Sequence, residues 1–172
     1  MEKQLKVFNN PKVLNIKSYD FTVYTDGASR GNPGKSGAGI FVFDNKKKKE
    51  IIKESFYLDT KTNNQAEYLA LALAAFLINE NIKNFSEYSF QFLADSELLI
   101  KQMTNEYKIK DPILKKLKTL IFSILNDSNY NFQHIRREKN TKADELANKG
   151  IDSKAGTPHK FTLLLQKNNL FI

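Results

Sequence analysis

The sequence contains no cysteine and no tryptophan, and only two histidines. Without cysteine, neither a disulfide framework nor a thiolate zinc site can form, which excludes secreted mini-scaffolds and zinc fingers. With so few nitrogen ligands, any bound metal must be held by carboxylates. The longest apolar stretch, residues 68–78, is well short of the roughly 20 residues that a transmembrane helix needs. We therefore expect no membrane-spanning segment.

The start of the chain also lacks the apolar core of a secretory signal, so we expect a cytoplasmic protein. Its 172 residues suit one compact domain. Lys and Arg total 27 against 19 Asp and Glu, a formal net charge of +8. Such an excess fits a nucleic-acid partner, whose phosphates it would neutralise, and fits equally a protein from a lysine-rich proteome.

Hydrophobic periodicity predicts a mixed α/β domain. Apolar residues alternate in five short runs, at residues 20–27, 38–44, 51–59, 88–95 and 131–137. Helical spacing is found at residues 64–79, 96–103, 111–126 and 141–150. This order favours a five-stranded sheet, three strands antiparallel and two parallel, flanked by helices. The glycine-rich segment GASRGNPGKSG after the first strand predicts a loop.

This pattern divides the chain into three segments. Residues 19–150 form the predicted domain, residues 1–18 an N-terminal extension, and residues 151–172 a tail that we expect to pack on the domain or on a partner.

Four acidic residues stand at the ends or first turns of the predicted elements: Asp26, Glu67, Asp95 and Asp144. An α/β protein commonly places a functional site at such positions. Each acid also has a simpler interpretation as a helix-capping or turn residue, with Asn64 and Thr141 as partners in two capping boxes. Capping explains neither the residues around the acids nor their order.

The segments around these acids carry a family resemblance. YTDGASRGNPGKSGAG, TNNQAEYLAL, FLADSELLIKQM and HIRREKNTKADELAN resemble the successive motifs of the type 1 ribonuclease H family, in order and in spacing. The resemblance implies a ribonuclease H-like fold. It also implies an endonuclease that cuts the RNA strand of RNA–DNA hybrids and leaves 5′-phosphate and 3′-hydroxyl ends.

The resemblance further implies two Mg²⁺ ions, with Mn²⁺ as a possible substitute, a choice that suits oxygen ligands. Asp26 resembles the bridging ligand, Glu67 and Asp95 belong to one metal site, and Asp144 completes the other. The backbone of Gly27 is implied both beside the metal and beside the RNA.

Substrate contacts are implied in the same way. Gly27, Ala28, Asn32, Asn63 and Ser96 are expected in the minor groove near the RNA 2′-hydroxyls, the groups that distinguish RNA from DNA. Thr62 and Asn64 are expected to hold a phosphate of the DNA strand. Turn formation and helix capping are the alternative roles of the asparagines.

Two departures from the family pattern indicate a branch with a shortened loop. The loop that carries a catalytic histidine in many members is reduced here to RREKN, so Arg136 or Arg137 is expected to take over part of its electrostatic role, while His134 is expected to be structural. The basic, tryptophan-bearing protrusion of some members is also missing. Five lysines remain as a weaker grip on DNA or as a solvated helix face: Lys108, Lys110, Lys115, Lys116 and Lys118.

Two alternatives remain open. One is a catalytically silent module that binds hybrids without cutting them, although none of the four carboxylates is missing. The other is the nuclease domain of a reverse transcriptase, for which a stand-alone monomeric enzyme without an organic cofactor is the simpler interpretation.

Overall fold

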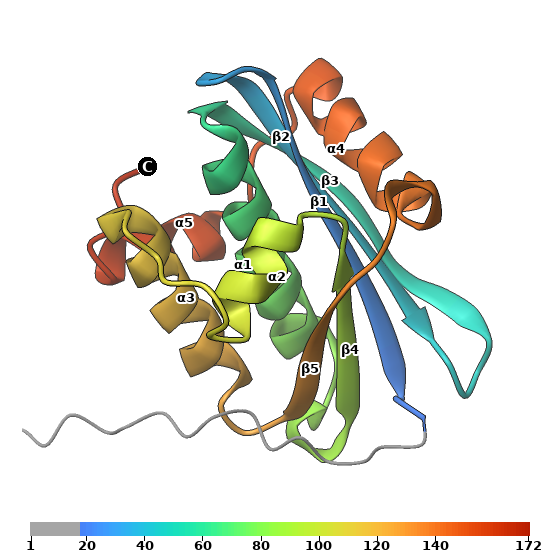
Figure 1. The fold of residues 1–172 in the computed structure, drawn as a ribbon. Helices are drawn as coiled ribbons and strands as arrows, with labels where there is room; N and C mark the ends of the chain where they lie inside the picture. Colours follow the sequence, from blue (N-terminus) through green and yellow to red (C-terminus); the bar gives the residue numbers. More distant parts are fainter. Residues whose placement is uncertain (1–17) are drawn as a thin grey trace, which may run out of the picture.

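A five-stranded mixed sheet forms the centre of the structure, a computed structural model that describes residues 18–172 (Figure 1). The predicted extension at residues 1–18 therefore lies, except for Ser18, outside the described residues. The strands are β1 (Phe21–Gly31), β2 (Gly34–Asp44), β3 (Lys49–Lys61), β4 (Ser89–Ala94) and β5 (Asn129–His134).

The strand order β3-β2-β1-β4-β5 confirms the predicted sheet. β1, β2 and β3 pair antiparallel as a meander, and β4 and β5 join the free side of β1 in parallel. The carboxyl ends of β1, β4 and β5 consequently lie at the same edge of the sheet. Ligand sites of α/β proteins lie at such edges.

Helices cover the sheet on two sides. The α-helices are α1 (Asn63–Asn81), α2 (Glu97–Met103), α3 (Pro112–Leu125), α4 (Thr141–Ser153) and α5 (His159–Lys167), with short 3₁₀ turns η1 (Phe85–Glu87) and η2 (Arg137–Lys139). α4 packs on one face of the sheet and α1 on the other, with α2, α3 and α5 on the side of α1 (Figure 1).

α1 is the central buried helix that its sequence predicts. Eleven consecutive residues, 68–78, are buried, because the helix is apolar nearly all round and is enclosed by neighbours on every side. Its first turn is held by a capping box in which the Thr62 hydroxyl accepts from the Gln65 N–H and the Gln65 side chain accepts from the Thr62 N–H. The prediction that Asn64 caps this helix is therefore wrong, because the cap is Thr62, two residues earlier.

The predicted loop after the first strand is also wrong. β1 continues to Gly31 and β2 begins at Gly34, so most of GASRGNPGKSG is paired strand and the reversal takes place at Asn32 and Pro33. Glycine-rich composition suggested a loop, yet these strands are glycine-rich because helices approach their backbone closely.

The tail contributes to the core. Phe161 of α5 is fully buried and its ring lies 5.5 Å from that of Phe76 in α1. Leu165 and Leu170 join the same apolar cluster. α4 runs on to Ser153, so the predicted boundary after residue 150 falls inside a helix. No helix within residues 18–172 is long and apolar enough to span a membrane.

Candidate active site

The site begins where β1 and β4 separate. Their parallel pairing ends at Tyr24 and Leu93, and Asp26 and Asp95 each follow two residues later. Asp26 lies inside β1 because its pairing with β2 continues, whereas Asp95 follows the last residue of β4. The two carboxylates thus flank a gap between strands that are adjacent in the sheet but distant in sequence.

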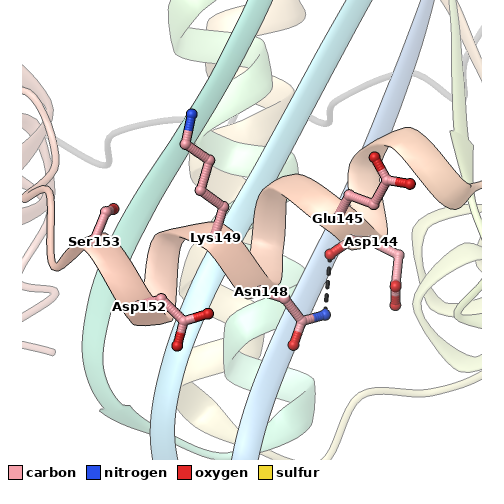
Figure 2. Close-up of a pocket in the computed structure, with 6 residues that line it drawn as sticks. All are labelled: Asp144, Glu145, Asn148, Lys149, Asp152 and Ser153. Atoms are coloured by element: carbon pink, nitrogen blue, oxygen red, sulfur yellow. Dashed lines mark hydrogen bonds between the residues drawn. The ribbon is translucent and has the colours of Figure 1, made fainter.

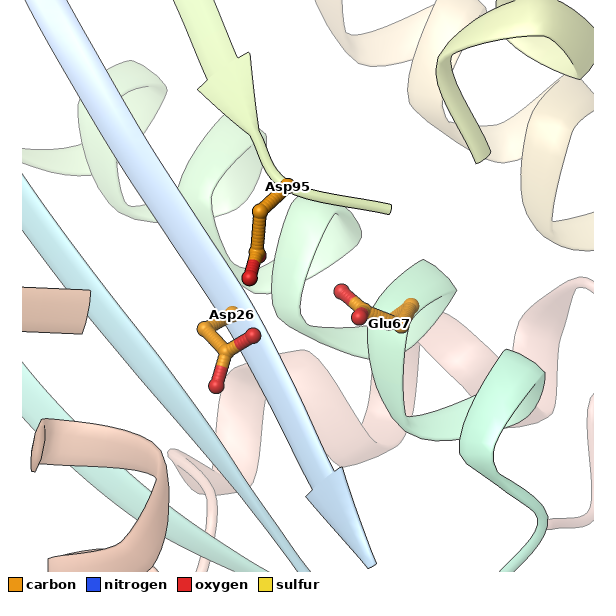
Figure 3. Close-up of side chains that lie close together, drawn as sticks. All are labelled: Asp26, Glu67 and Asp95. Atoms are coloured by element: carbon orange, nitrogen blue, oxygen red, sulfur yellow. The ribbon is translucent and has the colours of Figure 1, made fainter. Parts of the chain in front are cut away.

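Glu67 enters this gap from the first turns of α1. Its Oε2 accepts a hydrogen bond of 3.2 Å from the Gly27 N–H. A Cβ atom at position 27 would lie 2.2 Å from the backbone of Ala66 and Glu67, so only glycine lets α1 come this close to the sheet. As a result, carboxylate oxygens of Asp26, Glu67 and Asp95 lie within 4.8 Å of one another (Figure 3).

Asp144 reaches the site from the opposite face of the sheet. Gly39 pairs directly with Asp26, and a Cβ there would lie 2.1 Å from the carbonyl oxygen of Ala143 in α4. Directly paired antiparallel residues share a face, so α4 rests on β2 beside Asp26. Asp144 follows Ala143 in the first turn of α4, and Arg137 Nη2 donates to its Oδ1 at 2.9 Å.

The gathered carboxylates alter one another's protonation. Burial, followed by the negative charges of Asp95 and Asp144, raises the pKa of Asp26 to about 7. Burial and the charges of Asp26 and Asp95 also raise the pKa of Glu67 well above its usual value, against the opposing effect of the Gly27 hydrogen bond. The site has more negative charge than its own Arg137 can balance.

A divalent cation fits this donor set. Hard cations such as Mg²⁺ prefer carboxylate oxygens, and three residues offer them close together. Asp144 supplies a fourth carboxylate to the same pocket. Burial and then repulsion from Asp95 and Asp144 raise the pKa of Asp26, and the charge of a bound cation would oppose both effects.

Asn140 is a residue of the site that the sequence analysis missed. It is only 1% exposed, and its Nδ2 donates to the Thr25 carbonyl at 3.0 Å and to Asp95 Oδ1 at 2.9 Å. It thereby links the segment before α4 to the ends of β1 and β4. The signal that could have revealed it was its position directly before the predicted helix that carries Asp144, because asparagine is a common residue at the start of a helix.

A pocket of about 410 Å³ surrounds the acids. It brings together ten of the predicted site residues: Asp26, Gly27, Ala28, Asn63, Asn64, Glu67, Asp95, Ser96, Arg137 and Asp144. Its lining also includes three residues that were not predicted, Ser29, Arg30 and Asn148. Arg136 is in neither this pocket nor the neighbouring one, and its nearest ionic partner is Glu138 at 3.9 Å.

A second pocket of about 450 Å³ adjoins the first at Asn64. It holds two more of the predicted substrate residues, Asn32 and Thr62. The Asn32 side chain accepts from the Asn63 N–H at 3.0 Å, so the turn between β1 and β2 helps to cap α1. Asn32 thus makes the kind of contact that the capping alternative predicts.

Two other capping residues differ from each other. Ser96 caps α2, because its hydroxyl accepts from the Leu99 N–H. Thr141 does not cap α4, because it is the first residue of that helix and Asn140 is in the cap position.

A further hollow of about 650 Å³ runs along the exposed side of α4 (Figure 2). Asp144 lies at one end, where its backbone carbonyl accepts from Asn148 Nδ2 at 3.0 Å. Asp152 lies at the other end and forms a bidentate pair with Arg30 at 2.6 and 3.1 Å. This pair ties the end of β1 to α4.

Two expectations about the departures from the family pattern are corrected. His134 ends β5, where it pairs with Ala94 of β4, and its side chain is exposed and makes no hydrogen bond within residues 18–172, so it is not the satisfied structural histidine that was expected. Lys118 is partly buried and bonds internally, to the Gln102 carbonyl and at 2.7 Å to Asn105 Oδ1. It is therefore not available to grip DNA, whereas Lys108 and Lys110 line the second pocket.

Comparisons with known proteins agree with this arrangement. The RNase H family model matches residues 18–152. The ribonuclease HI of Halobacterium salinarum is 33% identical over 130 residues, which cover 75% of this chain and 63% of that protein. A bifunctional protein of Mycobacterium tuberculosis is 31% identical over 134 residues, 77% of this chain but 36% of its own length. The chain thus spans about a third to two thirds of these relatives.

A solved structure is similar throughout the domain. LC11-RNase H1, isolated from compost by a metagenomic approach, was solved in complex with an RNA/DNA hybrid. It shares 38% sequence identity at a TM-score of 0.72, over 77% of this chain and 97% of that one.

Proposed function

The chain belongs to the ribonuclease H family, and we propose that it is an endoribonuclease that hydrolyses the RNA strand of RNA–DNA hybrids. One observation carries the proposal: Asp26, Glu67, Asp95 and Asp144, from four separate elements, line one pocket. The complex of the similar LC11 enzyme with an RNA/DNA hybrid supports the choice of substrate.

In the proposed reaction a water oxygen forms a bond to a phosphorus atom of the RNA strand, and the bond from that phosphorus to the 3′-oxygen breaks. The 3′-oxygen takes up a proton, so the products carry 5′-phosphate and 3′-hydroxyl ends. Two divalent ions, Mg²⁺ or in its place Mn²⁺, would supply charge neutralisation and activation of the water.

The carboxylates would hold these ions from fixed positions. Asp26 is the proposed shared ligand, with Glu67 and Asp95 on one side and Asp144 on the other. Asp26 is held in a strand paired on β2, and Asn140 orients Asp95, so neither carboxylate needs to reorganise much on binding. Gly27 contributes its backbone N–H, which holds Glu67 in place.

Recognition of RNA is assigned to the rim of the pocket. Ala28, Asn63 and Ser96 line it and would meet 2′-hydroxyl groups across the minor groove, together with the backbone of Gly27. Thr62 and Asn64 line the adjoining pocket, and the proposal assigns them to a phosphate of the DNA strand. Asn32 lines the same pocket and is assigned to the RNA strand. Arg137 is proposed to offset developing negative charge, and its hydrogen bond to Asp144 supports this role.

Cleavage of three labelled duplexes tests the proposal: RNA–DNA hybrid, duplex DNA and duplex RNA, each with Mg²⁺, Mn²⁺ or EDTA. We expect cleavage of the RNA strand of the hybrid with metal and none with EDTA. Asp26→Asn and Asp95→Asn should abolish cleavage while the folded state and hybrid binding persist. Asp127→Asn, which changes an exposed aspartate outside both pockets, is the matched control and should cleave normally.

The same assay separates the alternatives. A wild-type protein that binds hybrid but cuts nothing would be a silent binding module. Cleavage of duplex DNA or duplex RNA at the rate of the hybrid, or an active Asp95→Asn variant, would refute the assignment.

A further inference from the structure

The face of the sheet on which α4 lies is only partly covered. Among the helices of residues 18–172, α4 alone packs on this side, and its main contacts are with β1, β2 and β3 (Figure 1). Its first turn lies against Gly39 of β2, and the sheet continues beyond that point. No helix of the described chain packs closely on β4 or β5 from this side.

The strand pairing aligns two rows of side chains across this face. One row runs from β2 to β5, each residue paired directly with the next: Phe41, Tyr24, Leu93 and Gln133. Two residues away along each strand, the second row consists of Phe43, Thr22, Gln91 and Asn131. Side chains alternate between faces along a strand, so the residues between the rows point the other way, and Val23 and Phe92 are buried there in the core.

Aromatic rings form the β2 and β1 end of this surface. Tyr24 and Phe43 are half-buried, so part of each side chain is exposed, and the rings of Tyr24 and Phe41 lie 5.7 Å apart. The three aromatic residues line a hollow of about 340 Å³. Aromatic side chains on a sheet face form a surface on which nucleic-acid bases stack, whatever their sequence, since every base has an aromatic face.

Amide groups form the β4 and β5 end. Gln91 Nε2 donates to Gln133 Oε1 at 2.7 Å, and Gln133 is exposed. Asn131 Oδ1 is buried and has no hydrogen-bond partner within residues 18–172, so this amide gains by turning toward a donor. Amides carry both donors and acceptors, which are the groups that bond to the edges of unpaired bases.

Lysines border the aromatic end. Lys139 and Lys142 line the hollow, and Lys142 Nζ lies 4.3 Å from the centre of the Phe41 ring. Lys142 is paired with Glu50 at 2.6 Å, whereas Lys139 has no acidic partner in the described part of the chain. Together with the net charge of +8, this arrangement favours a polyanion over an apolar peptide or a second copy of this positively charged chain.

We propose that this face of the sheet binds a single strand of nucleic acid. Its bases stack on Tyr24 and Phe43. The amides of Gln91 and Gln133 bond to base edges, and Lys139 lies beside a phosphate. A single strand fits this surface better than a duplex, because its bases are free to lie flat on the rings.

The surface is separate from the proposed active site. Tyr24 lines the aromatic hollow and Asp26 lines the pocket of the carboxylates, and the two linings share no residue. The inference therefore goes beyond the proposed function and does not depend on cleavage.

Fluorescence anisotropy of a labelled DNA strand tests the inference. The strand has about 12 nucleotides, within the range of site sizes on comparable surfaces, and EDTA keeps metal ions from joining its phosphates to the carboxylates. Phe43→Leu and Tyr24→Leu keep an apolar side chain and remove the ring, so each should weaken binding roughly tenfold. Phe171→Leu, which removes an exposed ring of the tail, is the matched control and should bind as wild type.

Three further measurements separate stacking, charge and location. A strand of the same length without bases should bind about as weakly as the ring variants do. Lys139→Met should reduce the slope of log affinity against log salt by about 0.7, the effect of one lost phosphate contact with a single strand. Asn63→Ala, which alters the rim of the carboxylate pocket, should leave binding of the single strand unchanged.

The inference is wrong if both ring variants keep wild-type affinity, or if the strand without bases binds as tightly as the normal one. Weaker binding in Asn63→Ala alone would place the strand at the carboxylates instead. Self-association of the wild-type chain that Phe43→Leu abolishes in sedimentation would identify a second copy as the occupant. If the ring variants do not fold, Gln133→Ala, a change at an exposed position, should weaken binding severalfold and decides in their place.

Discussion

The side chain of Asn140 bonds directly to the carboxylate of Asp95, with Nδ2 2.9 Å from Oδ1. The same nitrogen donates to the Thr25 carbonyl, one residue before Asp26. A single buried amide therefore sets the spacing between the ends of β1 and β4, where the acids gather.

Replacing Asn140 should affect both stability and metal binding. Asn140→Ala leaves the Thr25 carbonyl and Asp95 without their donor, so we expect a loss of about 1–3 kcal/mol in the free energy of unfolding. We also expect weaker Mn²⁺ binding by calorimetry, because Asp95 is no longer oriented. Asn81→Ala removes an amide that bonds to the Leu77 carbonyl, and is the matched control that should keep normal Mn²⁺ affinity. Unchanged affinity in Asn140→Ala would contradict the orienting role.

Gly39 controls how closely α4 approaches the sheet. In Gly39→Ala the new methyl group would meet the Ala143 carbonyl at 2.1 Å, so α4 must move and carry Asp144 with it. We expect a destabilisation of about 1–3 kcal/mol and a higher Mg²⁺ concentration for half-maximal cleavage. Gly156→Ala is the control, since no atom lies within 4 Å of a Cβ there. If both variants show the same metal dependence, the contact does not position Asp144.

Asp26 should make the metal-free protein sensitive to pH. The folded chain, in which the pKa of Asp26 is raised to about 7, keeps a proton that the unfolded chain releases near its usual value of 3.8. Stability contributed by this proton is complete below pH 4 and is lost as the pH rises toward about 7. In EDTA, Asp26→Asn should therefore be more stable than wild type by on the order of 2 kcal/mol at pH 7.5 and about equal to it at pH 4.

Urea denaturation in EDTA between pH 4 and 8 measures this difference. Added Mg²⁺ should stabilise the wild type much more than the variant, because only the wild type keeps all four carboxylates. Stability curves that stay parallel across the pH range would rule out the explanation.

Arg137 and Arg136 should differ although they are neighbours. Arg137→Ala removes the guanidinium that bonds to Asp144, and we expect the single-turnover cleavage rate to fall at least tenfold, the effect of one lost charged hydrogen bond, with a smaller change in hybrid affinity. Arg136 has a side chain that is 82% exposed and lies outside the pocket, so Arg136→Ala is the control. Equal losses in rate and affinity for Arg137→Ala would make it a phosphate anchor only.

The sequence by itself determined the five-stranded mixed sheet, the buried central helix and the four candidate acids. Local patterns in the sequence predict these features: apolar residues alternate in the strands, an apolar run forms α1, and a short motif surrounds each carboxylate. The same patterns misjudged the segment after Asp26. Its glycines resemble a loop in isolation, and only the helices packed on both faces of the sheet explain them.

Tertiary structure alone decided how the acids meet. The end of the pairing between β1 and β4 and the approach of α1 and α4 to Gly27 and Gly39 depend on contacts between distant segments. Asn140 has no distinguishing local pattern, because its role comes from a partner 45 residues away, Asp95. A buried amide such as Asn140 acquires its function only when the fold brings distant groups within reach of its hydrogen bonds.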